Sequence, residues 1–448
     1  MAAKKQAEKQ VTKTGKTEKV EKAQKTEAAG ESLDLSPAAL LAAAAYMTDI
    51  LPDGCLYHSW RVGLAAERIA SALVPDEAQT VFYAGLVQDV GTVGAYKHVT
   101  QYTSLQKQLD DPLIRSHPRR GAALLDWLPG MSDSAKLVRS HHEWWDGRGY
   151  PDGKVARRIP VGSQILLAVE MMDAAGCFAS TSSLVEGLRQ LAIFTGHAWS
   201  QEVWEAVVHS VEDAEFYKSI MDPTNMQTVI SEMLAKHPLP PELDSAEGLE
   251  RIFHVFAALV DAKDPSASGH SLRAARLAKG LVQQMGLSEN DVRTAYRAGL
   301  VHDCGRLGVP TPILMRSGLM RSGMFNDEEM GLVRKHAQMT MRVMSCMPTC
   351  PDMAVIGEIA GHDHERYDGT GYPDRLTGEN IHILSRILTV ADAFDAMTSS
   401  TSYKHLLSAR FAVIRLKQGA GSQFDPNVVD AMTGAVEGGA LEVEQAAA

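Results

Sequence analysis

The sequence predicts an all-α protein made of two tandem helical domains, and three observations lead to this fold class. Apolar residues recur at helical spacing from Leu33 onward, and few stretches alternate with a period of two as strands do. Clusters of Gly and Pro separate the helical blocks. The chain has 448 residues, more than one hydrophobic core usually holds, and motifs of its first half return in its second half.

The first 33 residues are predicted to be a disordered, Lys-rich tail. Residues 1–30 contain eight Lys, four Glu and no aromatic residue, so they cannot bury enough apolar surface to fold. Their net charge is +4 and the whole chain carries −11, so the remaining residues carry −15. An electrostatic tether to an acidic partner or to a membrane surface is the alternative interpretation of the tail.

Two helices are predicted at the start of the folded region. Apolar residues at helical spacing indicate the first at Leu40, Leu41, Ala44, Ala45, Met47 and Leu51, and the second at Val62, Ala66, Ile69, Ala70 and Leu73. No run of 18 apolar residues occurs, so no transmembrane segment is expected. Five Cys without paired spacing favour a reducing compartment, and the cytoplasm is the expected location.

The domain duplication rests on four motifs that recur in the same order. The segment from His141 to Asp152 resembles the segment from Asp363 to Asp374, at an offset of 222 residues. The other pairs are His58 with His270, Ala84–Asp89 with Ala298–Asp303, and His117 with His336, at offsets of 212, 214 and 219. Offsets that drift while the order holds indicate loop insertions between two copies of one domain. We therefore expect domains at residues 34–225 and 242–440, with Pro238, Pro240 and Pro241 marking the linker.

The negative charge of the folded region limits the ligands that it can bind. We do not expect it to bind duplex nucleic acid, because neutralising phosphates needs clustered Lys and Arg. An anionic ligand would need metal ions or a few well-placed cations to offset the negative field.

The second half contains a group of His and Asp residues that is typical of a metal site. His302 and Asp303 follow an apolar helical run, and an adjacent His and Asp suit a carboxylate that bridges two metals with the imidazole on one of them. A lone His-Asp pair occurs often by chance, so the weight comes from its companions, which are His270, His336, Asp363, His364 and Asp392. Imidazole and carboxylate together suit Fe, Mn or Zn. For any single His, a hydrogen-bonded structural residue is the simpler interpretation.

A Gly-rich loop, Asp368 to Pro373, lies beside this group. Its two Gly can adopt positive φ, and its Pro fixes the exit of the loop. The loop presents the ring of Tyr372, which can stack on a base or donate a hydrogen bond to a phosphate. An ordinary tight turn is the alternative interpretation.

Together these motifs resemble the HD-GYP domain family. The residues that carry the resemblance are Gly269–Ser271, His302-Asp303, His364 to Pro373, Val390 to Met397 and Gln423 to Pro426. The first half resembles the same family in a degenerate form. The resemblance implies an all-α fold of two tandem HD-type helical domains. It also implies a phosphodiesterase that opens cyclic di-GMP at a site of two or three metals, giving pGpG or GMP.

The resemblance also implies roles for individual residues. The metal ligands would be His270, His302, Asp303, His336, Asp363, His364 and Asp392, with Asp303 bridging. Ser266 stands where three-metal members carry a Glu, so two divalent ions are expected, with Fe or Mn as the ions. Metal-assisted hydrolysis would use His302, Asp303 and Arg306 as catalytic residues. Arg306, Tyr372 and Lys404 would bind the substrate.

Three positions depart from the family pattern. Asp363 replaces a His; a carboxylate can still bind metal, but it adds negative charge, and the neighbouring His362 is not expected to take its place. Arg306 replaces a Lys and keeps the positive charge. Thr401 replaces an Arg that binds phosphate, although Lys404 keeps a cation nearby.

The first half departs further. Gln88 replaces the His of the His-Asp pair, Thr92 replaces the Lys, and Glu170 replaces the last Asp ligand. Gln is a poor metal ligand beside imidazole. His58, Asp89, His117, His141 and His142 remain, so a single metal stays open. We expect this half to mediate dimerisation or to regulate the second half; a relic that only stabilises the fold is the alternative.

The expected function is therefore a metal-dependent phosphodiesterase that hydrolyses cyclic di-GMP through the second domain, with a homodimer and protein partners in signalling left open. The departures at Asp363 and Thr401 motivate an alternative from another class: a signalling protein that binds cyclic di-GMP or a partner protein without hydrolysing it. A third interpretation is a phosphohydrolase that acts on another phosphoester. Metal content and product analysis discriminate among the three.

Overall fold

The computed structural model describes residues 33–50, 55–95, 97–102, 104–317, 325–399 and 406–439. These residues form helices and irregular segments, and no strand occurs among them apart from two isolated bridges. The all-α prediction is thus confirmed. The predicted tail, apart from Leu33, lies outside the described residues.

The helices of the first half begin with two that the apolar periodicity predicted, α2 and α3. In order they are α2 (Pro37–Asp49), α3 (His58–Leu73), α4 (Ala78–Val87), α5 (Leu105–Asp110), α6 (Pro112–Leu125), α7 (Ser132–Ser140), α8 (Val161–Ala174), α9 (Thr181–Leu191), α10 (Gln201–Ser210), α11 (Ala214–Met221) and α12 (Met226–Lys236). Short 3₁₀ turns join several of them, at η1 (Pro75–Glu77), η2 (Val90–Thr92), η3 (Val99–Gln101), η4 (Ala156–Arg158), η5 (Cys177–Ala179) and η6 (Ala192–Phe194).

The helices of the second half follow the same order of long and short elements. They are α13 (Ala246–Lys263), α14 (His270–Gln284), α15 (Glu289–Val301), α16 (Thr311–Ser317), α17 (Asp327–Met344), α18 (Pro351–Gly361), α19 (Ile383–Thr398), α20 (Ala409–Gly419) and α21 (Pro426–Glu437). Their 3₁₀ turns are η7 (Pro265–Ala267), η8 (Cys304–Gly308) and η9 (Gly378–Asn380).

The packing of helices repeats between the halves. In the first half α3 packs against α4 and α8, and α6 packs against α7 and η2. In the second half α14 packs against α15 and α19, and α17 packs against α18 and η8. This repetition agrees with a duplicated helical unit, while the exact domain limits at residues 225 and 242 stay a prediction.

Local sequence explains where the helices that frame the site begin. Ser36 accepts a hydrogen bond from the backbone N–H of Ala39 and precedes Pro37, which suits the first turn of α2. Ser288 and Asp291 form a capping box at the start of α15, each side chain accepting a hydrogen bond from the other residue's backbone N–H. Such caps satisfy N–H groups that have no partner within the helix.

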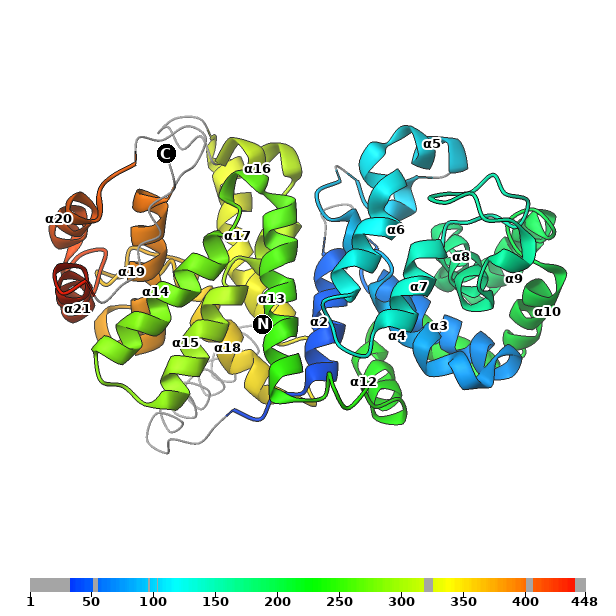
Figure 1. Cartoon of the computed structure of the whole chain (residues 1–448), viewed down its shortest axis with the longest axis horizontal. Helices are drawn as coiled ribbons and strands as arrows, with labels where there is room; N and C mark the ends of the chain where they lie inside the picture. Colours follow the sequence, from blue (N-terminus) through cyan, green and yellow to red (C-terminus); the bar gives the residue numbers. More distant parts are fainter. Residues whose placement is uncertain are drawn as a thin grey trace, which may run out of the picture.

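Helix α2 lies between the two halves, as Figure 1 shows. It packs against α3, α4 and α12 on one side and against α13, α17 and η8 on the other. Residues 39–49 of α2 are all buried. Because η8 directly follows His302 and Asp303, a helix from the first half supports the loop that carries the predicted site.

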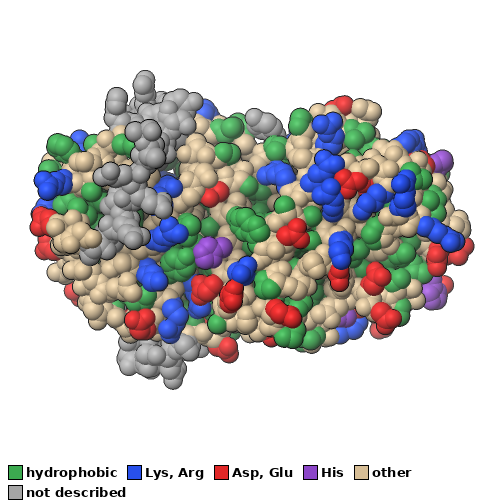
Figure 2. Space-filling model, viewed as in Figure 1, with side chains coloured by type: hydrophobic (Ala, Val, Ile, Leu, Met, Phe, Trp, Pro, Cys, Tyr) green, Lys and Arg blue, Asp and Glu red, His purple; other side chains and the backbone are tan. Residues whose placement is uncertain are grey.

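The surface is mixed in character. Figure 2 shows acidic, basic and apolar side chains interspersed on one face, with Lys and Arg more frequent over the first-half helices. Within the described ranges, no helix has the length and apolar character needed to cross a bilayer.

Candidate metal centre

All seven predicted ligands converge in the second half, although they come from five helices. His270 opens α14, His302 and Asp303 join α15 to η8, His336 lies in α17, Asp363 and His364 follow α18, and Asp392 lies in α19. Their ligand atoms form three overlapping groups, each within 4.8 Å: His270, His302 and Asp392; Asp303, His336 and His364; and Asp363, His364 and Asp392. The structure therefore brings together the set that the sequence predicts.

Asp303 belongs to the second group and also approaches the first. Its Oδ2 lies 3.4 Å from His302 Nε2 and 3.8 Å from His270 Nε2. Its Oδ1 lies 3.8 Å from His336 Nε2 on the other side. One carboxylate thus presents one oxygen to each group, which is the arrangement that a bridging ligand needs.

A glycine brings this carboxylate close to α17. A Cβ on Gly305 would lie 2.0 Å from the carbonyl oxygen of His336, so only glycine lets η8 approach the helix. The N–H of Gly305 donates to Thr340 Oγ1 at 3.0 Å, and that hydroxyl donates to the carbonyl of His302 at 2.8 Å. These contacts hold Asp303 and His336 in register.

The imidazoles are oriented by their outer nitrogens. Nδ1 of His302 donates to the carbonyl of Gly299 at 2.8 Å, and Nδ1 of His336 donates to the carbonyl of Val333 at 2.6 Å. A carbonyl only accepts, so each Nε2 carries the lone pair and faces the group. His270 is held by Asp395, which lies 2.7 Å from its Nδ1.

Several buried polar atoms at this centre have no hydrogen-bond partner. They are Nε2 of His302 and both carboxylate oxygens of Asp303 and of Asp363. Arg306 Nε lies 2.8 Å from Asp303 Oδ1, yet without hydrogen-bond geometry. Buried polar groups without partners are costly. Nitrogen and oxygen donors that point at common positions fit divalent ions of the Fe, Mn or Zn type.

The electrostatics of the ligands follow from burial and from their neighbours. Burial alone would raise the pKa of Asp303, but Arg306 and the surrounding imidazoles hold it well below its usual range. Burial and the neighbouring His364 lower the pKa of His336 to about 3. Burial also lowers the pKa of His364, to about 4. These pKa values keep the carboxylate ionised and the two imidazoles neutral, which are the forms that bind metal.

Asp363 faces the centre rather than capping the loop. Its side chain is fully buried, and its backbone carbonyl accepts a hydrogen bond from Thr389 Oγ1 at 2.6 Å. Burial and the nearby carboxylates of Asp392 and Asp303 raise the pKa of Asp363 well above its usual value. A third carboxylate at this point is compatible with the centre only if a cation or a proton offsets its charge.

The loop from Asp368 to Pro373 is fastened beside the ligands. Glu365 accepts hydrogen bonds from the backbone N–H groups of Asp374 at 2.6 Å and Leu376 at 3.1 Å. The ring of Tyr372 stacks on His364, with ring centres 4.9 Å apart. Tyr372 thus reaches the place that the sequence predicts. The role of Glu365 as the anchor of the loop was not predicted.

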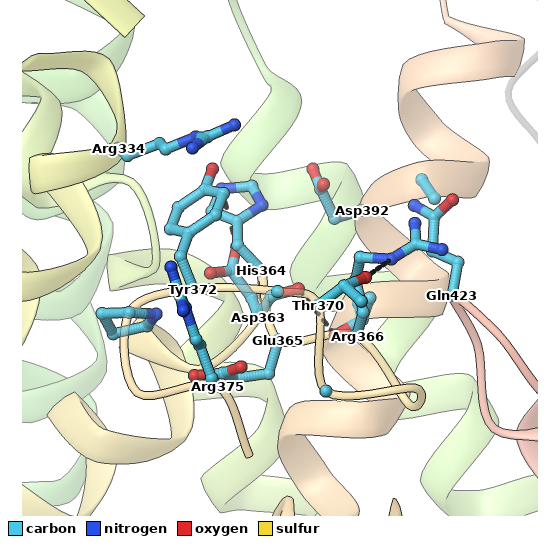
Figure 3. Close-up of a pocket in the computed structure, with 15 residues that line it drawn as sticks. Arg334, Asp363, His364, Glu365, Arg366, Thr370, Tyr372, Arg375, Asp392 and Gln423 are labelled. Atoms are coloured by element: carbon cyan, nitrogen blue, oxygen red, sulfur yellow. Dashed lines mark hydrogen bonds and ion pairs between the residues drawn. The ribbon is translucent and has the colours of Figure 1, made fainter. Parts of the chain in front are cut away.

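A cavity of about 620 Å³ opens over the centre. Its lining includes Asp363, His364, Tyr372 and Asp392 together with three arginines, Arg334, Arg366 and Arg375. Figure 3 shows Arg334 and Arg375 on the Tyr372 side and Arg366 with Gln423 on the opposite side. Sequence reasoning did not identify these arginines.

Arg375 has an unusual backbone. Its φ is +57°, a left-handed conformation that costs a residue with a side chain about 1 kcal/mol. The equivalent position in the first half is Gly153, with φ +65°. A comparison of the two repeats would have found this arginine, because it stands where the other copy has glycine.

Other predicted residues are placed less directly. Arg306 contacts Asp303, so it lies beside the predicted bridging ligand, and its role toward phosphate stays a prediction. Lys404 and Thr401 lie outside the described residues. His362 lies 3.2 Å from Asp374, away from the ligands as expected. Ser266 donates to Asp264 at 2.6 Å.

Comparisons with known proteins place this geometry in context. The model of the HD domain family matches residues 43–176 and 254–428. A 3'3'-cGAMP-specific phosphodiesterase of Vibrio cholerae is 30% identical over 71% of this chain and 66% of its own length. A cyclic di-GMP phosphodiesterase of Pseudomonas aeruginosa is 32% identical over 71% of each chain.

A second 3'3'-cGAMP-specific phosphodiesterase of V. cholerae is 27% identical over 78% of this chain and 80% of its own. The chain thus spans between 66% and 80% of the length of these three relatives. The fold is also similar to the crystal structure of a V. cholerae cyclic GMP-AMP specific phosphodiesterase. The TM-score is 0.63 at 23% identity, over 91% of this chain and 98% of that one.

Proposed function

The chain belongs to the HD domain family, and we propose that it is a metal-dependent cyclic dinucleotide phosphodiesterase whose active site lies in the second half. The observation that carries this proposal is Asp303, whose two oxygens face two separate groups of ligands. The proposed ligands are His270, His302 and Asp392 for one ion, His336 and His364 for the other, Asp303 for both, and Asp363 beside them. When bound, divalent ions such as Fe or Mn lower the pKa of the attacking water and neutralise charge on the phosphoryl oxygens.

The surrounding residues suit an anionic substrate with planar bases. Arg334 and Arg375 supply positive charge in a chain whose net charge is −11, and Arg366 lies in the cavity paired with Asp368 at 3.1 Å. Tyr372, stacked on His364, presents a ring edge and a hydroxyl to the cavity, while Gln423 offers an amide on the other side. In this proposal the arginines orient the phosphates, and Tyr372 positions a base or a phosphate next to the ligands.

Cyclic di-GMP is the first proposed substrate, with pGpG or GMP as the product. A second candidate is 3'3'-cGAMP, because two relatives that match both halves of the chain bear that specificity in their names. Both substrates share the ribose-phosphate ring and differ in one base, so the same centre can serve either.

The test is turnover by the full chain loaded anaerobically with Mn²⁺ or Fe²⁺. Cyclic di-GMP, 3'3'-cGAMP and the linear dinucleotide pGpG are supplied separately, and products are separated by chromatography. Asp303→Asn keeps the size of the side chain and removes its charge, so it is the matched control. The proposal predicts a linear product from a cyclic dinucleotide with the unaltered chain and none with Asp303→Asn.

The competing function is a protein that binds cyclic dinucleotides without hydrolysing them. Equilibrium dialysis in the presence of metal decides between the two. Tight binding of cyclic di-GMP without any linear product, in protein that retains about two metal ions per chain, would establish the binding protein instead.

The first half is proposed to regulate the second half or to mediate dimerisation. The contact of α2 with η8 supports the regulatory part, because it joins the first half to the loop that follows Asp303.

A further inference from the structure

We propose that the first half binds one divalent metal ion of its own, held by Asp89, His117, His141 and His142, and that this ion stabilises the domain. The inference rests on the geometry of the first half and not on the activity proposed for the second half.

Three imidazoles converge in the first half. His117, His141 and His142 each offer a nitrogen to a common position, and these atoms lie within 4.8 Å of one another. The ring centres of His142 lie 4.8 Å from those of His117 and 4.3 Å from those of His141. Asp89 completes the set, with its Oδ1 3.5 Å from His117 Nε2.

The hydrogen bonds of two of these rings leave their inner nitrogens without protons. Nδ1 of His117 donates to the carbonyl of Ile114 at 2.6 Å, and Nδ1 of His141 donates to the carbonyl of Val138 at 2.5 Å. In the neutral ring each Nε2 is then an acceptor. The two Nε2 atoms lie only 3.0 Å apart, so two lone pairs face each other unless a proton or a metal ion lies beside them.

The other donors of the set also lack partners. Both nitrogens of His142 and Oδ1 of Asp89 are buried without a hydrogen bond. An unpartnered buried imidazole is costly, whereas an imidazole bound to a metal is satisfied. A metal ion therefore accounts for one nitrogen of His142, for Oδ1 of Asp89 and for the close approach of His117 and His141. Glu170 Oε2 lies 3.5 Å from His142 Nε2.

The first half keeps the residues of one proposed ion position of the second half and has replacements at the other. Gln88 stands where the second half has His302, and Glu170 stands where it has Asp392. His58 keeps the kind of contacts that His270 has, with Asp173 2.5 Å from its Nδ1 and Asp89 3.1 Å from its Nε2. One of the two proposed ion positions of the second half thus has two of its ligands replaced in the first half. The other keeps His117 and His142 and gains His141, so one ion is expected.

This site is closed. The side chains of His117, His142 and Asp89 are 0%, 1% and 2% exposed, and His141 is fully buried. In the second half the side chains of His364 and Asp392 are 22% and 19% exposed. Three imidazoles and one carboxylate with no side open to a substrate are typical of a structural ion, and such a donor set suits Zn²⁺.

Metal analysis tests the proposal. The full chain carrying His302→Ala and Asp303→Ala loses the second-half ligands. We expect it to retain about one metal ion per chain, measured by mass spectrometry after exhaustive dialysis. Adding His141→Ala should remove this ion. Adding His98→Ala is the matched control, because His98 is an equally buried histidine of the first half outside the set.

Thermal unfolding gives a second measurement that leaves the four ligands intact. The His302→Ala, Asp303→Ala chain is stripped with a chelator and then supplied with Zn²⁺. We expect its Tm to rise by about 5 °C or more, since a ligand that binds only the folded state stabilises it. No retained metal and no Zn²⁺-dependent rise in Tm would overturn the proposal, as would an ion that survives His141→Ala in folded protein. Neither result bears on hydrolysis in the second half.

Discussion

The two halves share one helical framework but differ in how their ligand clusters meet the solvent. In both, a His at the start of a helix is held by an Asp three residues beyond the last ligand position: His58 by Asp173, and His270 by Asp395. The second-half cluster opens into a cavity of about 620 Å³, whereas the first-half cluster is buried.

The difference teaches that one helical framework can carry different residues at its ligand positions. Some contacts that orient the predicted ligands survive in the first half. A Cβ on Gly91 would lie 2.1 Å from the carbonyl oxygen of His117 in α6, as a Cβ on Gly305 would lie 2.0 Å from that of His336 in α17. Three ligand positions carry different residues in the first half, which are Gln88, His141 and Glu170. These three exchanges accompany the difference between the open cluster of the second half and the closed cluster of the first.

The sharpest test of this contrast exchanges ligands in one half at a time. His302→Ala with Asp303→Ala should lower turnover by at least about 1,000-fold and remove metal from the second half, because the bridging carboxylate and the activated water are lost together. Asp89→Ala, assayed at a temperature where the protein remains folded, should lower turnover by no more than a few-fold. Abolition of turnover by Asp89→Ala alone would show that the first half takes part in the chemistry.

Arg375 tests whether the cavity of the second half was shaped for an anion. Arg375→Gly should raise KM for the cyclic dinucleotide about tenfold, because a charged hydrogen-bond donor to phosphate is lost. It should also raise the free energy of unfolding by about 1 kcal/mol, since glycine tolerates φ +57°. Arg375→Ala is the control: it should raise KM equally without the gain in stability. Equal KM values for all three chains would remove Arg375 from the substrate site.

Asp363 tests the charge difference between the two clusters, because the first half has His141 at this position. Asp363→His should speed hydrolysis several-fold with Mn²⁺ and move the rise of the pH–rate profile to lower pH. The reason is that one anionic ligand fewer strengthens the pull of the metal on the bound water. Metal stoichiometry should stay the same, since both side chains bind metal. An unmoved profile at equal metal occupancy would mean that Asp363 is not a ligand.

The smallest expected effect concerns Glu67, which holds the end of α12 and the residue after it against α3. Glu67 in α3 contacts Lys236 at 2.6 Å and His237 at 2.9 Å, whereas the equivalent residue in α14 is Lys279. Burial alone would raise the pKa of Glu67, but hydrogen bonds from Lys236, His237 and Ser71 lower it below its usual value. Glu67→Gln should therefore lower the free energy of unfolding by about 1 kcal/mol at neutral pH.

The pH dependence of this difference follows from the lowered pKa. The folded carboxyl is ionised at a lower pH than the unfolded one, so its contribution is complete above the unfolded pKa. It is lost as the pH falls through the folded pKa. Denaturant titrations of both chains between pH 7 and pH 3 should converge at the acidic end. A difference that stays constant over this range would exclude the ionised Glu67 as its source.

The convergence of the predicted ligands could be predicted from sequence because four of the seven, His270, Asp303, His336 and His364, recur in the same order in the first half. The cavity arginines could not be predicted as a group. Arg334 reaches Tyr372, with its guanidinium 5.6 Å from the ring centre, only because α17 is turned toward the loop. In the sequence, Glu365 is only one residue of a motif. It accepts hydrogen bonds from the backbone N–H groups of Asp374 and Leu376 because the loop folds back, which the sequence does not indicate.

The burial of α2 could be predicted from its composition, although the periodicity of its apolar residues did not predict it. The segment Ala39 to Met47 is apolar on every side, and a helix of that kind must be covered all round. The sequence therefore indicated burial, but it did not indicate that the covering helices belong to both halves.

That placement of α2 has a consequence for anyone who cuts this chain into fragments. A recombinant piece beginning at the proline-rich linker would leave α2 behind and expose the apolar faces of α13 and α17 that α2 covers. It would also remove one of the supports of η8, which begins at the residue after Asp303. If such a fragment were inactive or aggregated, the cause would be its exposed apolar core and not the loss of regulation by the first half. Dissection of the two halves is better done by substitution in the intact chain, or with a fragment to which residues 33–50 are grafted back.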